Sequence, residues 1–215
     1  IPAQHMDFVE WQGSGITDIS LQQTTVDMTA DRNITAVFAP HHYNVTINKT
    51  GNGTVTSSGT HAYGSTIALS ADPAAGYNFS HWSGYGPDSN VSATTSLTIQ
   101  QDHALVAVFT PMAYTIETSV TAGGSVNISE ESPYLFDSNY TLIASPDFGY
   151  IFSHWSSPSD SLSFLGNQNS EISTFLVQGD ASYQANFSLI TYNLSVAMGT
   201  GGMEVSPASG DLSIL

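Results

Sequence analysis

One ten-residue phrase that ends in tryptophan occurs three times in the chain and sets the spacing of its other motifs. It is clearest at residues 73–82 (PAAGYNFSHW) and 146–155 (PDFGYIFSHW), and a more divergent copy stands at residues 2–11 (PAQHMDFVEW). The final residues of the copies, Trp11, Trp82 and Trp155, are the only tryptophans and lie 71 and 73 residues apart. Self-similarity at such a fixed period predicts an array of small modules rather than one large domain.

Other landmarks keep this period and define the module boundaries. Tyr43 and Tyr114 open two complete copies, which we assign to residues 43–110 and 114–189. Residues 1–38 match the second half of a copy, and residues 192–215 match the first half. The phenylalanines that close the two complete copies, Phe109 and Phe187, are 78 residues apart. We expect the extra length to fall in the Ser- and Asn-rich stretch around Gly166.

The pattern within each copy predicts a mostly β fold. Apolar and polar residues alternate from Tyr43 to Ile47, and similar short segments are separated by Gly, Asn and Ser. This pattern is typical of strands with one buried face, while the Pro-x-x-Gly-Tyr piece predicts a turn. We expect tandem small β-rich modules of about 71–78 residues, such as small β-sandwiches. The expected core anchors are Trp11, Trp82, Trp155, Phe38, Phe109 and Phe187.

Composition excludes several classes of partner. Only 9% of the residues are charged, the formal net charge is −16, and Lys49 and Arg32 are the only lysine and arginine. A chain of this charge repels phosphate backbones, so we expect no nucleic-acid binding. No apolar run approaches the ~20 residues that span a bilayer, and no signal-like segment is recognisable in this sequence. Cysteine is absent, which excludes disulfides and thiol chemistry.

Glycosylation sequons are more frequent than composition predicts. Ser and Thr supply 53 of the 215 residues, so about three of the asparagines would precede them at the sequon spacing by chance. The matching residues are Asn33, Asn44, Asn48, Asn52, Asn78, Asn90, Asn127, Asn139, Asn186 and Asn193. Asn44 lies between Tyr43 and Val45, which predicts that it faces solvent. We therefore expect N-linked glycans; the alternative is that strands rich in Ser, Thr and Asn inflate the count.

The ordered succession of motifs resembles a known repeat family. Each complete copy contains versions of Tyr-x-Val-x-Ile, Gly-x-Gly-x-Val, Ile-x-Leu-x-Ala-x-Pro-x-x-Gly-Tyr-x-Phe-x-x-Trp and Ala-Val-Phe, and this order resembles the divergent internalin-B-repeat family. The resemblance covers nearly the whole chain and implies tandem extracellular modules of large surface proteins, without catalytic residues. It also implies that each module is β-grasp-like, as the alternative to a small β-sandwich. The first copy departs from the pattern, because His5 and Met6 replace Gly and Tyr.

The histidines favour structural roles over catalysis or metal binding. His81 and His154 each follow a serine and precede the tryptophan, but the first copy has Glu10 at this position. A catalytic histidine would not be exchanged for glutamate between copies, so we expect partly exposed strand residues. The pair at residues 41–42 has no third ligand at a useful spacing for a metal.

Aspartates recur before the last predicted strand of each copy, at Asp31, Asp102 and Asp180. We expect each to accept a hydrogen bond from the backbone of its own turn. The acidic surface could hold Ca²⁺ diffusely, but no loop has the spacing of an ordered Ca²⁺ site. We expect no cofactor.

These observations favour a non-enzymatic structural segment of an extracellular, N-glycosylated stalk, sheath or filament. Sequon density in this type of repeat favours an archaeal cell surface. The chain starts and stops at nearly the same phase of the repeat, which has two explanations. Either the terminal halves join head-to-tail between copies, or the sequence is a window cut from a longer array. The alternative function is an adhesin or carbohydrate-binding module that uses loop aromatics such as Tyr85 and Tyr134.

Overall fold

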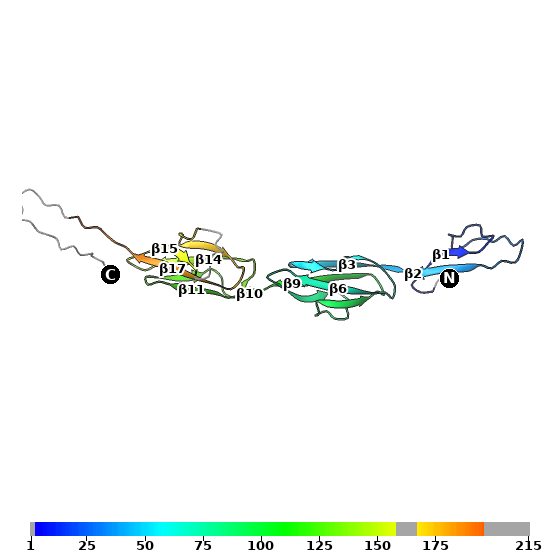
Figure 1. Cartoon of the computed structure of the whole chain (residues 1–215), viewed down its shortest axis with the longest axis horizontal. Helices are drawn as coiled ribbons and strands as arrows, with labels where there is room; N and C mark the ends of the chain where they lie inside the picture. The colour runs from blue at the N-terminus through cyan, green and yellow to red at the C-terminus, as the bar shows by residue number, and fades with distance from the viewer. Residues whose placement is uncertain (1–2, 158–166, 196–215) are drawn as a thin grey trace, which may run out of the picture. The chain divides into compact units, whose positions relative to one another are not determined.

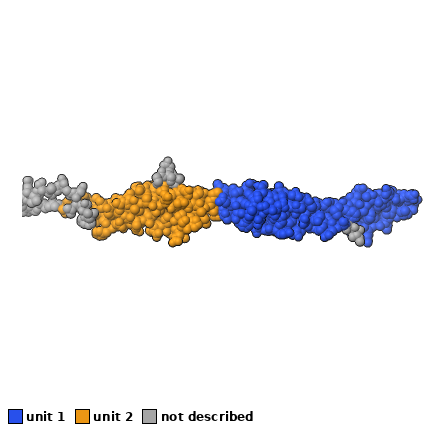
Figure 2. All heavy atoms as spheres, turned by 90° about the horizontal axis from the view of Figure 1, so that it is seen from below, with its two compact units in different colours: residues 1–110 blue, residues 111–215 orange. Residues whose placement is uncertain are grey.

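The computed structural model describes residues 3–157 and 167–195, which form β-strands and loops without a helix. The chain divides into two compact units, residues 1–110 and 111–215 (Figure 2). We call the half copy at residues 1–38 repeat 1, the complete copy at 43–110 repeat 2 and the copy at 114–189 repeat 3. Of the predicted half copy at 192–215, the structure describes only residues 192–195. Gly166 also lies outside the described residues.

Repeat 2 consists of two sheets that close on one core (Figure 1). The first sheet has the order β5-β3-β9-β7, formed by Gly59–Ala62, His42–Thr50, His103–Pro111 and Tyr77–Ser83. The second has the order β4-β6-β8, formed by Gly53–Val55, Thr66–Pro73 and Thr94–Thr98. The first and last long strands, β3 and β9, are parallel neighbours, with Val45 opposite His103. The other strand pairs with a given register are antiparallel.

Repeat 3 has the same arrangement. One sheet has the order β11-β17-β15, formed by Ile116–Val120, Ala181–Leu189 and Tyr150–Ser156. The other has the order β12-β14-β16, formed by Gly124–Ile128, Asn139–Pro146 and Ile172–Leu176. The short strands β10 (Ala113–Tyr114) and β13 (Tyr134–Leu135) pair separately. The prediction of tandem β modules is confirmed. Because the described residues contain no helix to cover a sheet, the module is a small sandwich rather than a β-grasp.

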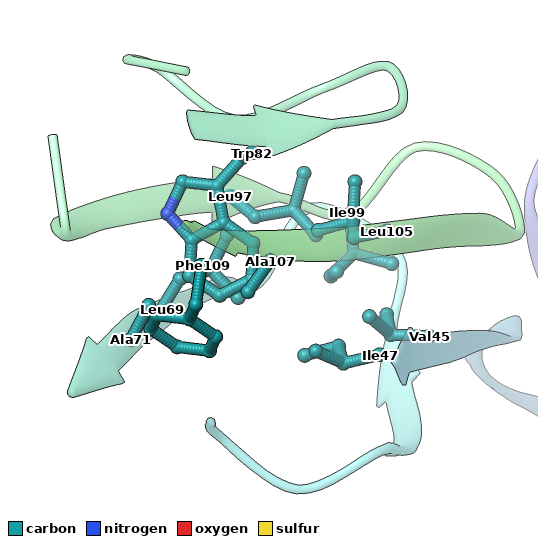
Figure 3. Close-up of a cluster of buried hydrophobic side chains, with 10 residues drawn as sticks. All are labelled: Val45, Ile47, Leu69, Ala71, Trp82, Leu97, Ile99, Leu105, Ala107 and Phe109. Carbon is teal, nitrogen blue, oxygen red and sulfur yellow. The ribbon is translucent and has the colours of Figure 1, made fainter. Parts of the chain in front are cut away.

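The core of repeat 2 joins side chains from both sheets (Figure 3). Trp82 on β7 and Leu105 on β9 come from one sheet, and Leu69 on β6 and Leu97 on β8 come from the other. All four are essentially inaccessible to solvent. Full burial of one aliphatic side chain is worth about 1.5–3 kcal/mol, so this cluster supplies much of the stability of the module.

A β-bulge explains the Phe-x-x-Trp spacing. In a regular strand, residues three apart point to opposite faces. The pairing of β15 with β17 shifts register between Phe152 and His154, and one extra residue is accommodated there. Phe152 and Trp155 therefore reach the same side, with ring centroids 5.4 Å apart. The rings of Phe79 and Trp82 in repeat 2 are 5.8 Å apart.

Repeat 1 contains only the second half of this module. Its strands β1 (Met6–Gln12) and β2 (Thr35–Pro40) form a two-stranded antiparallel sheet with a bulge at the equivalent position, between Phe8 and Glu10. The turn before β1 is retained although His5 replaces glycine. His5 has a φ of 62°, close to the 78° of Gly76 and the 85° of Gly149. Histidine is one of the non-glycine residues that tolerate this region.

Candidate functional site

The sequon asparagines lie on the outside of the modules. Nine of the ten predicted residues are exposed, whereas Asn186 is half-buried. On β3, Asn44 and Asn48 alternate with the buried Val45 and Ile47. This alternation places the asparagine side chains on the solvent face of the strand. The structure thus leaves most sequons sterically open to a transferase.

Asn186 differs from the other sequon asparagines because its amide nitrogen is engaged. Nδ2 donates to the backbone oxygen of His154 at 3.1 Å and to Oγ of Ser156 at 2.8 Å. These contacts fill the irregular pairing where the bulge of β15 faces β17. Nδ2 is the atom that would carry a glycan, so attachment here requires these hydrogen bonds to break.

The tryptophans are held in the same way in all three repeats. Trp82 and Trp155 are each 1% exposed, while Trp11 is half-buried. Each indole N–H donates to a carbonyl of the loop that follows its strand, with distances of 2.9, 3.1 and 2.9 Å for the partners Leu21, Ser92 and Ser170. A buried indole needs such an acceptor. The Trp residues are therefore packing groups with no free polar atom for chemistry.

The phenylalanine anchors complete an aromatic cluster with each tryptophan. Phe38, Phe109 and Phe187 close the three repeats, and each lies edge-on to the phenylalanine of the Phe-x-x-Trp motif, with interplanar angles of 73°, 70° and 73°. Phe109 is buried, whereas Phe38 and Phe187 are half-buried. Edge-to-face pairs add about 0.5–1.5 kcal/mol beyond area burial, which explains the fixed aromatic positions.

The Ser-His pairs do not form a catalytic arrangement. Ser80 Oγ lies 3.0 Å from Nδ1 of His81, and Ser153 lies 3.0 Å from His154 in the same way. Both are adjacent residues, on strands whose serines point to solvent. Glu10, at the equivalent position of repeat 1, accepts instead from Gln12 at 2.9 Å. Nucleophilic catalysis needs a base that is itself oriented by a third group, and among the described residues neither histidine has a carboxylate partner.

The repeated aspartates have a role that differs from the predicted one. Oδ1 of Asp102 accepts from the backbone N–H of Asn44 at 2.8 Å, and Oδ1 of Asp180 accepts from Thr115 at 2.7 Å. The partners lie 58 and 65 residues away, so the expectation of a bond within the turn is wrong. Each aspartate joins the start of the last strand to the start of the first strand. We call this contact the aspartate clamp.

The junction between repeats 1 and 2 is a polar-aromatic cluster. The ring of His5 stacks on Tyr63 with centroids 4.0 Å apart, and its Nδ1 lies 2.8 Å from the hydroxyl of Tyr43. His41 forms an ion pair with Asp7 at 2.8 Å when it is protonated. The histidine pair at 41–42 is thus used for inter-repeat contact through its first member. At the end of repeat 3, Gly149, Ile190 and Tyr192 occupy the positions of His5, His41 and Tyr43 and line an open hollow with Phe148.

The two loop aromatics predicted for sugar binding have different surroundings. Tyr85 is 81% exposed in the loop between β7 and β8, beside a shallow polar depression that includes Asp88 and Asn90. Tyr134 is 8% exposed and belongs to the core of repeat 3. The expectation that Tyr134 is a surface aromatic is wrong, because its hydroxyl reaches the carbonyl of Glu130 while its ring packs against Tyr140. Burial raises the pKa of Tyr134.

The described residues were also examined for clusters of metal ligands and for helices that could span a membrane. In residues 3–157 and 167–195, no three His, Asp or Glu side chains gather as a metal ion would require. Over the same residues there is no helix with the length and apolarity needed to cross a bilayer.

The fold and these surfaces define a class: tandem small β-sandwiches whose repeated residues serve packing and inter-strand contacts. The chain matches the divergent InlB B-repeat domain over residues 1–42, 43–113 and 114–191. It therefore belongs to the divergent InlB B-repeat domain family, as the sequence motifs indicated. No curated protein and no solved structure gives a significant match.

Proposed function

We propose that this chain is a non-enzymatic structural segment of an extracellular, N-glycosylated cell-surface protein that acts as a stalk, sheath or filament. Membership of a family of surface-protein repeats supports the location. The proposal rests on one observation: the core-forming aromatic residues and the sequon asparagines occupy separate parts of each repeat. Tryptophans and phenylalanines fill the cores of repeats 2 and 3, while nine sequon asparagines face solvent.

Glycans at these positions suit a structural role. Asn44 and Asn48 lie on β3, and Asn127 lies on β12, all with exposed side chains. A glycan there extends into solvent without disturbing the core, and bulk near strand edges opposes unwanted pairing with other chains. The surface is acidic and rich in hydroxyl groups, which suits solubility outside the cell. The proposed partners are N-linked glycans, neighbouring repeats, and further copies of the chain joined head-to-tail through residues 1–38 and 192–215.

The test is glycopeptide mapping by mass spectrometry on protein recovered from its native host. We expect sugar on several exposed sequons, including Asn44 or Asn127, and bare peptide at Asn186. Surface labelling of intact cells should modify the protein. Recovery of unmodified protein that only becomes labelled after lysis would contradict the proposal.

A second candidate function is carbohydrate binding through Tyr85. Tyr85 is 81% exposed, and its own loop carries polar groups at Asp88 and Asn90 that suit contact with sugar hydroxyls. Glycan-array binding that disappears in Tyr85→Ala but persists in Tyr192→Ala, another exposed tyrosine, would favour this reading. A silent array would favour the structural role alone.

A further inference from the structure

The loop between β7 and β8 of repeat 2 presents an exposed aromatic ring beside a sequon. Tyr85 is 81% exposed, and Val91, inside the sequon that begins at Asn90, is 72% exposed. The side chain of Asn90 is exposed as well. Tyr85 and Asn90 line the same shallow depression, which is formed by residues 84–90. Apolar surface and an attachment point for a glycan therefore share one small region of the molecule.

The backbone of this loop is held in place near both residues. The N–H of Trp82 donates to the backbone oxygen of Asn90 at 2.6 Å. His103 is 7% exposed, and its Nδ1 lies 2.9 Å from the backbone oxygen of Tyr85. A carbonyl oxygen can only accept, so Nδ1 carries the proton in this contact. The loop is thus ordered before a ligand arrives, which lowers the entropic cost of binding.

Two glycines allow the backbone on either side of Tyr85 to lie close to β9. Gly84 has a φ of 113° and Gly86 a φ of 122°. A Cβ at Gly84 would lie 2.4 Å from the backbone oxygen of Ala104, and one at Gly86 would lie 2.7 Å from Cε1 of His103. The backbone is therefore packed against the module while the side chain of Tyr85 remains in solvent.

The polar side chains of the depression differ in their surroundings. Oδ2 of Asp88 accepts from the hydroxyl of Ser96 on β8. The side-chain amide of Asn90, by contrast, has no hydrogen-bond partner in the described part of the chain. It also differs from Asn186, whose Nδ2 donates two hydrogen bonds that a glycan would have to break. Nδ2 of Asn90 is therefore free to carry a glycan.

We propose that an N-linked glycan on Asn90 folds back and stacks one of its sugar rings on Tyr85. A pyranose ring has a face of C–H groups, which is attracted to the negative face of an aromatic ring. Attachment at Asn90 holds the sugar beside the ring at a high effective concentration, which a separate carbohydrate lacks. This inference rests on the proposed N-glycosylation, and it assigns Tyr85 to a glycan of the chain itself.

Nitration of tyrosine tests this contact directly. The natural chain and Asn90→Gln are produced in the native host and treated with tetranitromethane, and nitration is mapped by mass spectrometry. We expect Tyr85 to react several-fold more slowly in the natural chain, because a stacked sugar covers its ring. Tyr192, which is 67% exposed, should react equally in both. Asn127→Gln removes another exposed sequon and should leave the nitration rate of Tyr85 unchanged.

Hydrogen exchange distinguishes stacking from simple shielding by a bulky glycan. Exchange over residues 84–92 should be several-fold slower in the glycosylated natural chain than in Asn90→Gln. Tyr85→Phe keeps the aromatic ring and should keep this effect of the glycan, whereas Tyr85→Ala should abolish it. A glycan that only shields the loop would slow exchange equally with Tyr, Phe or Ala at this position, which would contradict the proposed contact.

Three further results would overturn the inference while leaving the structural surface role in place. The first is an Asn90 without sugar in a chain whose other sequons are glycosylated. The second is equal nitration of Tyr85 with and without the Asn90 glycan. The third is Tyr85-dependent binding to a glycan array by a chain that carries the Asn90 glycan, because the ring would then be available to a separate carbohydrate. Absence of sugar from every sequon would instead refute the proposed N-glycosylation itself.

Discussion

Repeats 2 and 3 build the same sandwich around partly different cores. Both keep a fully buried leucine, Leu69 or Leu142, in the same cluster as the tryptophan, and a buried alanine two residues later. Elsewhere the aliphatic Leu97 is replaced by Phe175, and Leu105 is replaced by Tyr183. The centroids of Phe175 and Tyr183 lie 5.1 Å apart in repeat 3, where repeat 2 has aliphatic packing.

This difference shows which part of the module is fixed. The aromatic cluster of the Phe-x-x-Trp motif keeps its geometry in every repeat, with Phe–Trp centroid distances of 5.5, 5.8 and 5.4 Å. The core positions of Leu97 and Leu105 accept either aliphatic or aromatic side chains. Cores tolerate such exchange when total volume and patterning are maintained. The Phe-x-x-Trp cluster is therefore the constant part of the core, whereas these two positions can diverge between repeats.

The largest expected effect is loss of the tryptophan. Trp82→Ala or Trp155→Ala should each destabilise its own repeat by about 3–5 kcal/mol, because a large buried side chain leaves a cavity. Trp11→Ala should cost clearly less, since Trp11 is half-buried. Hydrogen exchange followed by mass spectrometry reports each repeat separately. An equal cost for Trp11→Ala would show that repeat 1 already has a complete core.

A smaller effect is expected where glycine contacts the closing phenylalanine. A Cβ at Gly53 would lie 2.6 Å from Cζ of Phe109, and one at Gly124 would lie 2.4 Å from Cζ of Phe187. Gly53→Ala and Gly124→Ala should therefore each cost about 1–3 kcal/mol through overpacking. Gly179→Ala is the control, because a Cβ there meets no atom within 4 Å. Chemical denaturation measures all three. Neutral Gly53→Ala and Gly124→Ala variants would mean that the phenylalanine rings move aside freely.

The aspartate clamps should contribute equally to the two repeats. Asp102→Ala and Asp180→Ala each remove one hydrogen bond to an exposed N–H, so we expect a loss of about 1 kcal/mol. Asp147→Ala serves as a control, because Asp147 makes its turn contacts through the main chain. Thermal denaturation of the variants provides the comparison. A large loss in only one repeat would indicate that the clamps are not equivalent.

The smallest expected difference in stability between repeats 2 and 3 appears only in alkaline solution. Burial raises the pKa of Tyr183 above its ordinary value of 10.0, and the equivalent residue in repeat 2 is Leu105. Because the pKa is raised in the folded state, the contribution of protonated Tyr183 to the stability of repeat 3 is complete below pH 10.0. This contribution decreases as the pH rises through the folded-state pKa. Repeat 3 should therefore lose stability before repeat 2 as the pH rises, by hydrogen exchange. Tyr183→Phe should reduce this difference; an unchanged difference would implicate another group, such as Tyr134.

The sequence predicted the repeats, the strands and the buried aromatic residues, because period-2 alternation and a fixed Trp spacing determine which residues face a core. It could not predict that β3 lies beside β9, since alternation identifies a buried face and not a neighbouring strand. For the same reason, the partners of Asp102 and Asp180 were missed. Tyr134 was misplaced because a tyrosine among Ser, Pro and Glu has the composition of a loop, although it begins a short buried strand.

Among the candidate surfaces, the outward position of most sequons followed from alternation. The half-burial of Asn186 could not be predicted in this way, because the hydrogen bonds of its side chain depend on a bulge in the partner strand β15. The bulge itself had a sequence signal, since Phe and Trp three residues apart cannot share one face of a regular strand.

The parallel pairing of β3 with β9 has a mechanical consequence. The chain enters repeat 2 through β3 and leaves it through β9, and the two strands run in the same direction over six residue pairs from Val45–His103 to Thr50–Val108. Tension applied through the chain pulls them in opposite directions along their length. The hydrogen bonds between them are then loaded in shear and must fail together instead of opening one by one. Repeat 3 has the same arrangement in β11 and β17, so each complete repeat is built to bear load along the chain.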